Sequence, residues 1–238
     1  MCSRRICQDA GDDRMELDGL FMKIMQGEVR MSDVFRYVPN HAEIGVGLAL
    51  LDEQEDYVFF LAGTRHKFTS NELFYAGIGG HLEPGEDLLS CGKREAMEEI
   101  GAEVHIQCSP VNPVYISKDK EIRAITMTDE CKPLAIYEMI HPSGSPREGE
   151  IYYLVIYQAT LRSSLTHLKT DEVSGVIAMK KEQVKKGVFR RATLQTLVDE
   201  GARLIASSPH IQPDVIVYPI GTAEALSYYL NYMESNQR

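Results

Sequence analysis

The chain has 238 residues, of which 44% are hydrophobic, and it carries a formal net charge of −10 at pH 7. This composition suffices for a normal buried core, and the length allows one large domain or two small ones. The negative charge argues against a general affinity for nucleic acids or anionic membranes, because both depend on clustered Lys and Arg side chains that neutralise phosphate. We therefore expect neither as a partner.

The N-terminal segment, residues 1–42, is mixed and charged and is typical of an extension, with a short helix over 14–26. It lacks the apolar region of a signal peptide, and no run in the chain approaches the roughly 18 apolar residues of a membrane-spanning helix. The sequence therefore predicts a soluble, cytoplasmic protein.

Two apolar runs, 43–51 and 57–62, flank the turn-like sequence DEQED and predict a β-hairpin. A further strand is expected over 75–82. Between these strands lies the sequence TRHK, in which Arg65 and Lys67 are candidates to contact a phosphate group. A solvated turn is an equally good interpretation of these four residues.

The segment from Gly80 to Ala102 reads GHLEPGEDLLSCGKREAMEEIGA. Its Pro-Gly pair favours a tight turn. From about residue 88 to 100 the apolar side chains recur on one side of a helix. Glu95, Glu98 and Glu99 are neighbours on this helix, because residues three and four apart share a face. The helix therefore presents a cluster of three carboxylates.

Such a cluster is unfavourable near a helix C-terminus unless a cation lies among its oxygens. Hard oxygen ligands suit Mg²⁺ or Mn²⁺, and Mg²⁺ commonly binds carboxylates together with substrate phosphates. Arg94 lies four residues before Glu98 and can orient a carboxylate with its guanidinium group. An acidic helix face by itself is usually only solvated. The complete spacing, with both glycines and Glu86, favours a metal site that acts on a phosphate ester or anhydride.

This spacing resembles the signature of the Nudix hydrolases over about a tenth of the chain. The resemblance implies a divalent metal, Mg²⁺ or Mn²⁺, held by the backbone carbonyl of Gly80 and by Glu95, Glu98 and Glu99. It implies that Glu86 supports the helix or the surroundings of the metal. The two aliphatic positions of the signature hold the small residues Ala96 and Ala102, a departure that concerns packing rather than chemistry.

After the helix, strand-like stretches are expected over 103–116, 134–140, 150–161 and 173–179, followed by helical segments over 193–206 and 222–233 around an apolar stretch at 215–220. This order fits an α+β sandwich. The resemblance implies the Nudix fold, a mixed sheet sandwiched between helices. We place the hydrolase domain at 43–190, between the N-terminal extension and a helical C-terminal extension, 191–238, packed on the core.

The general base is left open by the resemblance, between a glutamate of the helix, Glu98 or Glu99, and one in a later loop. Glu172, just before the strand at 173–179, is the downstream candidate, with an exposed loop carboxylate as the alternative. Glu150 is a weaker candidate.

The chain has five cysteines, an odd number without a CxxC pair, so the sequence indicates neither a disulfide framework nor a zinc site. Cys91 lies one turn before Glu95 and either faces the site or is buried. Near the C-terminus, Tyr228, Tyr229 and Tyr232 either stack on a base or pack against the core.

The expected activity is hydrolysis of a diphosphate bond in a nucleoside diphosphate linked to another moiety, with ADP-ribose or a nucleotide sugar favoured. The alternative is a Nudix-fold nucleotide-sugar sensor that regulates transcription without turnover. Regulators of that kind often have eroded signatures and a basic DNA-binding module, whereas this signature is intact. A homodimer is common among similar proteins.

Overall fold

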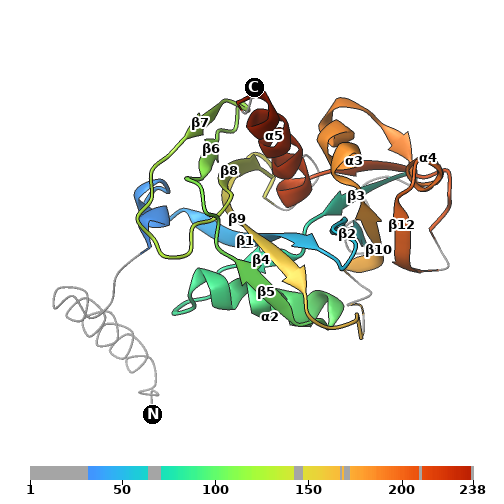
Figure 1. Ribbon diagram of the computed structural model, residues 1–238, viewed down its shortest axis with the longest axis horizontal. Helices are drawn as coiled ribbons and strands as arrows, with labels where there is room; N and C mark the ends of the chain where they lie inside the picture. The colour runs from blue at the N-terminus through green and yellow to red at the C-terminus, as the bar shows by residue number, and fades with distance from the viewer. Residues whose placement is uncertain are drawn as a thin grey trace, which may run out of the picture.

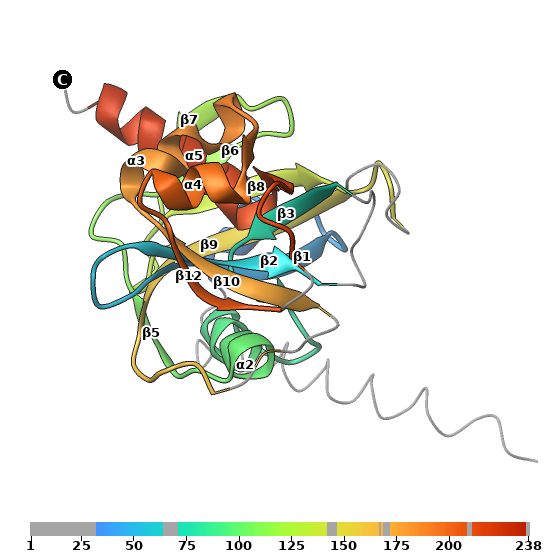
Figure 2. The ribbon, with the colours of Figure 1, turned by 90° about the vertical axis from the view of Figure 1, so that its right-hand side faces the viewer.

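A computed structural model describes residues 32–63, 71–141, 147–166, 168, 172–208 and 211–236. Its centre is a mixed sheet with helices on both faces, as Figures 1 and 2 show. Helix α2 covers one face of the sheet, whereas α3, α4 and α5 lie on the other side (Figure 2). The predicted α+β sandwich is confirmed. The helix predicted over 14–26 lies outside the described residues.

The strands are β1 (Glu43–Leu51), β2 (Tyr57–Ala62), β3 (Glu72–Ala76), β4 (Gly79–His81), β5 (Val104–Gln107), β6 (Val114–Ile116), β7 (Ile122–Ala124), β8 (Ala135–Ile140), β9 (Ile151–Leu161), β10 (Val173–Met179), β11 (Ala192–Thr193), β12 (Arg203–Ser207) and β13 (Ile216–Pro219). The helices are α2 (Leu88–Ile100), α3 (Lys181–Lys186), α4 (Leu194–Asp199) and α5 (Gly221–Ser235), with short 3-10 helices η1 (Asp33–Arg36) and η3 (Gly187–Phe189).

Strand β1 lies at the centre of the sheet, whose main order is β11-β13-β3-β2-β1-β9-β8-β6-β7. It pairs in parallel with β9 along its whole length, from Glu43 opposite Tyr152 to Leu51 opposite Thr160. Because side chains alternate along a strand, β1 presents different residues to the two layers. Val46 and Leu48 approach α2, whereas Gly47 lies against the beginning of α5.

Helix α2 has the bounds expected from the sequence. The carboxylate of Asp87 accepts hydrogen bonds from the N–H groups of Leu89 and Ser90, at 2.9 and 3.0 Å, and so caps its N-terminus. Gly101, with φ of 59°, ends the helix in the left-handed conformation that glycine adopts readily. Gly92 lets the helix approach β1, since a Cβ there would lie 3.0 Å from the Leu48 side chain.

The C-terminal segment contains strands as well as helices. The helix predicted over 193–206 is wrong in its second half, because α4 ends at Asp199 and β12 begins at Arg203. Gly201, with φ of 102°, turns the chain there, and β12 then pairs with β10. Strand β13 pairs in parallel with β3. The separation of this segment from a domain at 43–190 stays a prediction.

One disulfide bond joins Cys108 to Cys131, with their Cα atoms 4.5 Å apart. The sequence, which indicated no disulfide framework, therefore did not reveal this bond. The sheet brings together the end of β5 and the residues before β8, and the N–H of Ser109 donates to the carbonyl of Lys132 at 2.9 Å. Pairing across 23 residues follows from this topology, which spacing along the chain does not reveal.

Among the described residues, none of the helices is long and apolar enough to cross a membrane. Disulfides are rare in a reducing cytoplasm. The cytoplasmic location stays a prediction.

Candidate functional site

A groove of about 480 Å³ lies where α2, β4, the β8–β9 pair and the beginning of α5 meet. Its size is within the range of small-molecule sites. One part of its wall is charged, with Glu95, Glu98, Glu99, Arg94 and Glu172, and another is apolar, with Phe60, Phe74, Met139, Leu154 and Ile220.

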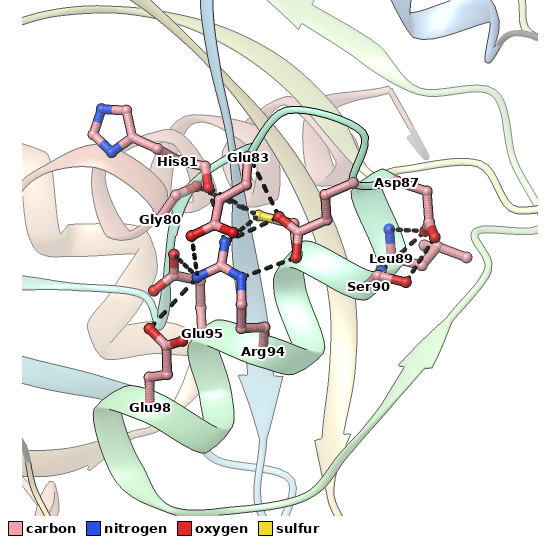
Figure 3. A network of polar contacts seen from close by, with 11 residues as sticks. Gly80, His81, Glu83, Asp87, Leu89, Ser90, Arg94, Glu95 and Glu98 are labelled. Carbon is pink, nitrogen blue, oxygen red and sulfur yellow. Dashed lines mark hydrogen bonds and ion pairs between the residues drawn. The ribbon is translucent and has the colours of Figure 1, made fainter. Parts of the chain in front are cut away.

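Arg94 is the centre of a polar network at the charged end (Figure 3). Its Nε donates to Glu86 at 2.9 Å, and its terminal nitrogens donate to Glu95 at 2.8 Å and to the carbonyl of His81 at 3.0 Å. The hydrogen bond from Arg94 is the main reason that the pKa of Glu86 lies below its usual value. Arg94 thus fixes the loop before α2 to the helix.

The three predicted carboxylates lie in different surroundings. Glu95 is mostly buried against Gly80, where a Cβ would lie 2.3 Å from the Glu95 Oε1 atom. Glu99 is buried, and its carboxylate accepts the N–H of Gly79 at 3.1 Å. Glu98 is half exposed and lies 3.5 Å from Arg94. The glycines of β4 therefore allow the helix carboxylates to approach the strand backbone.

The surroundings of Glu95 disfavour the charged form of its carboxyl group. Burial is the largest cause that raises the pKa of Glu95, Arg94 opposes this shift, and the charges of Glu98 and Glu172 raise the pKa further. A cation near these oxygens would remove this cost.

Glu172 is brought to the site by the fold, although it lies far from α2 in the sequence. It lines the same groove, and its backbone carbonyl accepts the N–H of Gly63 at 2.7 Å, where β2 ends. Glu150 does not line this groove, and its exposed carboxylate accepts a hydrogen bond from Arg147 at 2.8 Å. The structure thus separates the two downstream candidates.

Whether a metal ion suits this groove depends on its donor atoms. Within the described ranges, no three His, Cys, Asp or Glu side chains are arranged as a ready metal site. Arg94 lies among the carboxylates and reaches both Glu95 and Glu98. Even so, the donors that line the groove are carboxylates beside a backbone carbonyl, the oxygen chemistry that Mg²⁺ and Mn²⁺ prefer. The residues present therefore fit such an ion.

Tyr152 was missed by the sequence interpretation, which treated it as part of a strand. Its hydroxyl donates to the Gly80 carbonyl at 3.3 Å, and burial is the main cause that raises its pKa. A Cβ at Gly45 would lie 1.5 Å from this hydroxyl. Gly45 and Gly47 within one strand were the available signal, because strand glycines mark places of close approach.

A charged cluster also lies at the mouth of the groove and was missed. Glu43 forms an ion pair with Arg147 and contacts a ring nitrogen of His81, and its carboxylate lies 3.6 Å from His141 Nε2. The rings of His81 and His141 lie 4.9 and 5.7 Å from that of Tyr152. Through Glu43, the side chains of His141 and Arg147 connect the loop after β8 to the start of β1.

The remaining sequence candidates lie elsewhere. Arg65 and Lys67 fall outside the described residues. Cys91 is buried, its sulfur lies 3.4 Å from the His81 carbonyl, and burial raises its thiol pKa to about 12. Tyr228, Tyr229 and Tyr232 do not line the groove and pack partly buried against the core.

A mixed sheet between helices, with this glutamate-bearing helix beside a strand of glycines, defines the protein as a hydrolase of the Nudix type. A family model described as NUDIX domain matches residues 41–197, well over half of the chain. The chain therefore belongs to the Nudix family, whose members generally use divalent metal ions and small-molecule nucleotide substrates.

Several solved structures are similar to this chain at low identity. A NUDIX hydrolase from Nitrosomonas europaea is 16% identical, with 60% of this chain and 76% of that one covered and a TM-score of 0.40. A NUDIX-family hydrolase from Clostridium perfringens is 17% identical, with 82% and 99% covered and a TM-score of 0.42. A MutT protein from Methanosarcina mazei Go1 is 10% identical, with 84% and 99% covered and a TM-score of 0.43. No curated protein matches the sequence.

Proposed function

We propose that this protein hydrolyses a diphosphate bond in a nucleoside diphosphate linked to another moiety. The observation that carries the proposal is the convergence of Glu95, Glu98, Glu99 and Glu172 on one groove beside the Gly80 carbonyl. A surplus of carboxylates in a partly buried groove suits a bound cation and a phosphate substrate.

In this proposal Gly80, Glu95, Glu98 and Glu99 hold Mg²⁺ or Mn²⁺. Such an ion, when bound, neutralises charge on the diphosphate and polarises a water molecule. Arg94 orients Glu95 and ties it to Glu86 through the hydrogen bonds described above. The network around Arg94 therefore fixes the carboxylates before a substrate arrives, which is the main contribution that a protein makes to phosphoryl transfer.

We assign the general base to Glu172, with Glu98 and Glu99 as the helix alternatives that the sequence leaves open. Glu172 lines the groove together with the helix glutamates. It enters the site from the loop before β10, and so approaches the substrate from another element than the helix glutamates. A base that accepts the proton of the attacking water must reach that water without being one of the fixed ligands.

The apolar part of the wall favours a substrate with an organic moiety on each side of the linkage. Phe60, Phe74, Met139 and Leu154 provide a surface for a base or a sugar face. ADP-ribose or a nucleotide sugar is the first choice of substrate.

The alternative of a DNA-binding regulator loses support from the basic residues near 185–191. Lys185 pairs with Glu182 and Glu234. Arg190 pairs with Glu200, and Arg191 pairs with Glu72. Because acidic partners neutralise these side chains, they do not form a free basic surface for phosphates.

The test is incubation of the purified protein with a panel of nucleoside diphosphate compounds, each with Mg²⁺, with Mn²⁺ and with a chelator. We expect cleavage of at least one compound to a nucleoside monophosphate, and no cleavage with the chelator. If the protein binds a compound of the panel but cleaves none of them, the hydrolase proposal is refuted and the sensor is favoured.

A further inference from the structure

The groove has a second polar end, formed by the N-terminus of α5. Helix α5 has 15 residues, its N-cap is Ile220, and no side chain caps it. The N–H groups of Ala223 and Glu224 reach the Ile220 carbonyl, whereas those of Gly221 and Thr222 donate to no acceptor in the described part of the chain. Both Gly221 and Thr222 line the groove. This end of the helix therefore offers free donors and a positive dipole end to the groove.

Thr222 provides an independent sign that a ligand belongs here. The residue is 2% exposed, and its hydroxyl makes no hydrogen bond within the described ranges. Its oxygen is not one of the fully buried polar atoms that lack a partner, so it keeps some access to the groove. Thr222 lines the groove, so a ligand there is the natural partner for its hydroxyl.

The Thr222 side chain packs against glycines of the sheet and of the segment after β3. A Cβ at Gly47 would lie 1.9 Å from the Thr222 hydroxyl oxygen, and one at Gly77 would lie 2.7 Å from its Cβ. Gly47 on β1 and Gly77, between β3 and β4, thus allow Thr222 to pack against the sheet. The contacts with Gly47 and Gly77 therefore hold the Thr222 hydroxyl in one position.

The two polar ends are close enough for one substrate. At the carboxylate end, the Tyr152 hydroxyl donates a hydrogen bond to the Gly80 carbonyl. At the other end, a Cβ added to Gly221 would lie 3.8 Å from the Leu154 side chain. These two residues are two positions apart on β9, a separation of roughly 7 Å along a strand. A molecule whose linkage lies at the carboxylates can therefore reach α5.

We propose that the Gly221 and Thr222 N–H groups and the Thr222 hydroxyl form a phosphate subsite, which binds a phosphate group of the substrate outside the linkage that is cut. Three donors at a helix N-terminus match the oxygens of a phosphate group. The assignment of a substrate phosphate rests on the proposed function. It predicts a preference for nucleoside diphosphate compounds that carry an additional phosphate, such as 2′-phosphorylated ADP-ribose over ADP-ribose.

The first experiment measures binding of inorganic phosphate by calorimetry to the full chain in the presence of a chelator, so that a metal at the carboxylates cannot contribute. We expect Thr222→Val, which keeps the shape and removes the hydroxyl, to weaken binding by about tenfold or more, because a hydrogen bond to a charged group is lost. Thr222→Ser should restore it. Thr160→Val is the matched control, since Thr160 lies on β9 outside the groove and should bind as the unaltered protein does.

A second measurement uses turnover with Mg²⁺. The ratio of KM values for ADP-ribose and its 2′-phosphorylated form should fall towards one in Thr222→Val. If Thr222→Val does not fold, Gly47→Ala replaces it, because the added Cβ must displace the Thr222 hydroxyl.

Absence of phosphate binding to the unaltered protein, or equal binding by Thr222→Val, would overturn the subsite. Failure of every diphosphate compound to turn over, with phosphate binding that still depends on Thr222, would refute the proposed hydrolysis and retain the subsite. The two proposals can therefore fail separately.

Discussion

Arg94 and Arg203 each contact more than one carboxylate, and the difference between them separates a reactive site from a structural one. Arg94 has four carboxylates within 4.0 Å, those of Glu83, Glu86, Glu95 and Glu98. Arg203 contacts two, those of Asp52 and Asp56, and joins β12 to the turn between β1 and β2.

The balance of charge is what distinguishes the two clusters. At Arg203 a single guanidinium faces two mostly buried aspartates, and the Asp52 carboxylate also accepts the N–H groups of Gln54 and Asp56, at 2.9 and 3.1 Å. Those hydrogen bonds already stabilise the charge. At Arg94 four carboxylates share one guanidinium, and the pKa of Glu95 is raised, first by burial and then by the charges of Glu98 and Glu172. A surplus of this kind is a sign of function, whereas a balanced cluster stabilises the fold.

The largest effect is expected from Glu98→Gln. The substitution removes one charged oxygen donor and keeps the shape, so turnover of the substrate found in the panel should fall by about three orders of magnitude. Stability should be unchanged or slightly higher, because a like-charge neighbour of Glu95 is neutralised. The measurements are kcat with Mg²⁺ and the midpoint of thermal unfolding. Asp52→Asn at the other arginine is the control, with lower stability and normal turnover. Normal turnover in Glu98→Gln would refute the metal assignment.

A smaller loss of turnover is expected from Glu172→Gln. Loss of a general base commonly costs about a hundredfold or more. The acidic limb of the kcat profile against pH should disappear, whereas the affinity for Mn²⁺, measured by calorimetry, should change little. Glu150→Gln is the matched control, since that carboxylate is exposed and outside the groove. An unchanged pH profile in Glu172→Gln would return the role of base to the helix glutamates.

Arg203→Leu should affect stability alone. It leaves Asp52 and Asp56 mostly buried without their guanidinium, at a cost in the free energy of unfolding of about 2 kcal/mol. Urea unfolding measures this cost, and turnover per folded molecule should stay normal. A clear loss of turnover would show that the cluster at Arg203 also acts on the site, and the contrast with Arg94 would be lost.

The sequence was sufficient for the elements whose signals are local. The turn at Gly85, the helix that carries Glu95 and the spacing to Gly101 are all determined by near neighbours along the chain. The pairing of Cys108 with Cys131 and the approach of Thr222 to Gly47 depend on the sheet order, which no local pattern specifies.

The helix expected over 193–206 failed for a related reason. An amphipathic pattern there was compatible with a continuous helix, but Gly201 breaks it and β10 offers an edge to pair with. Tertiary pairing therefore overrode a local preference, as it commonly does for short segments.

The smallest effect distinguishes two carboxylates that share Arg94. The hydrogen bond from Arg94 lowers the pKa of Glu86 in the folded protein below its unfolded value. Its contribution to stability is therefore present above the unfolded pKa and is lost as the pH falls through the lower, folded pKa. Glu95 has the opposite sign, because burial raises its folded pKa, and its ionisation destabilises the fold as the pH rises from the unfolded towards the folded pKa. The measurement is the free energy of unfolding in urea at a series of pH values from acidic to neutral. In Glu86→Gln, this free energy should fall less as the pH is lowered. In Glu95→Gln, it should fall less as the pH is raised from the unfolded towards the folded pKa of Glu95. The same change in both variants would mean that Arg94 does not divide its neighbours in this way, and that the surplus charge at the site is shared evenly among the carboxylates.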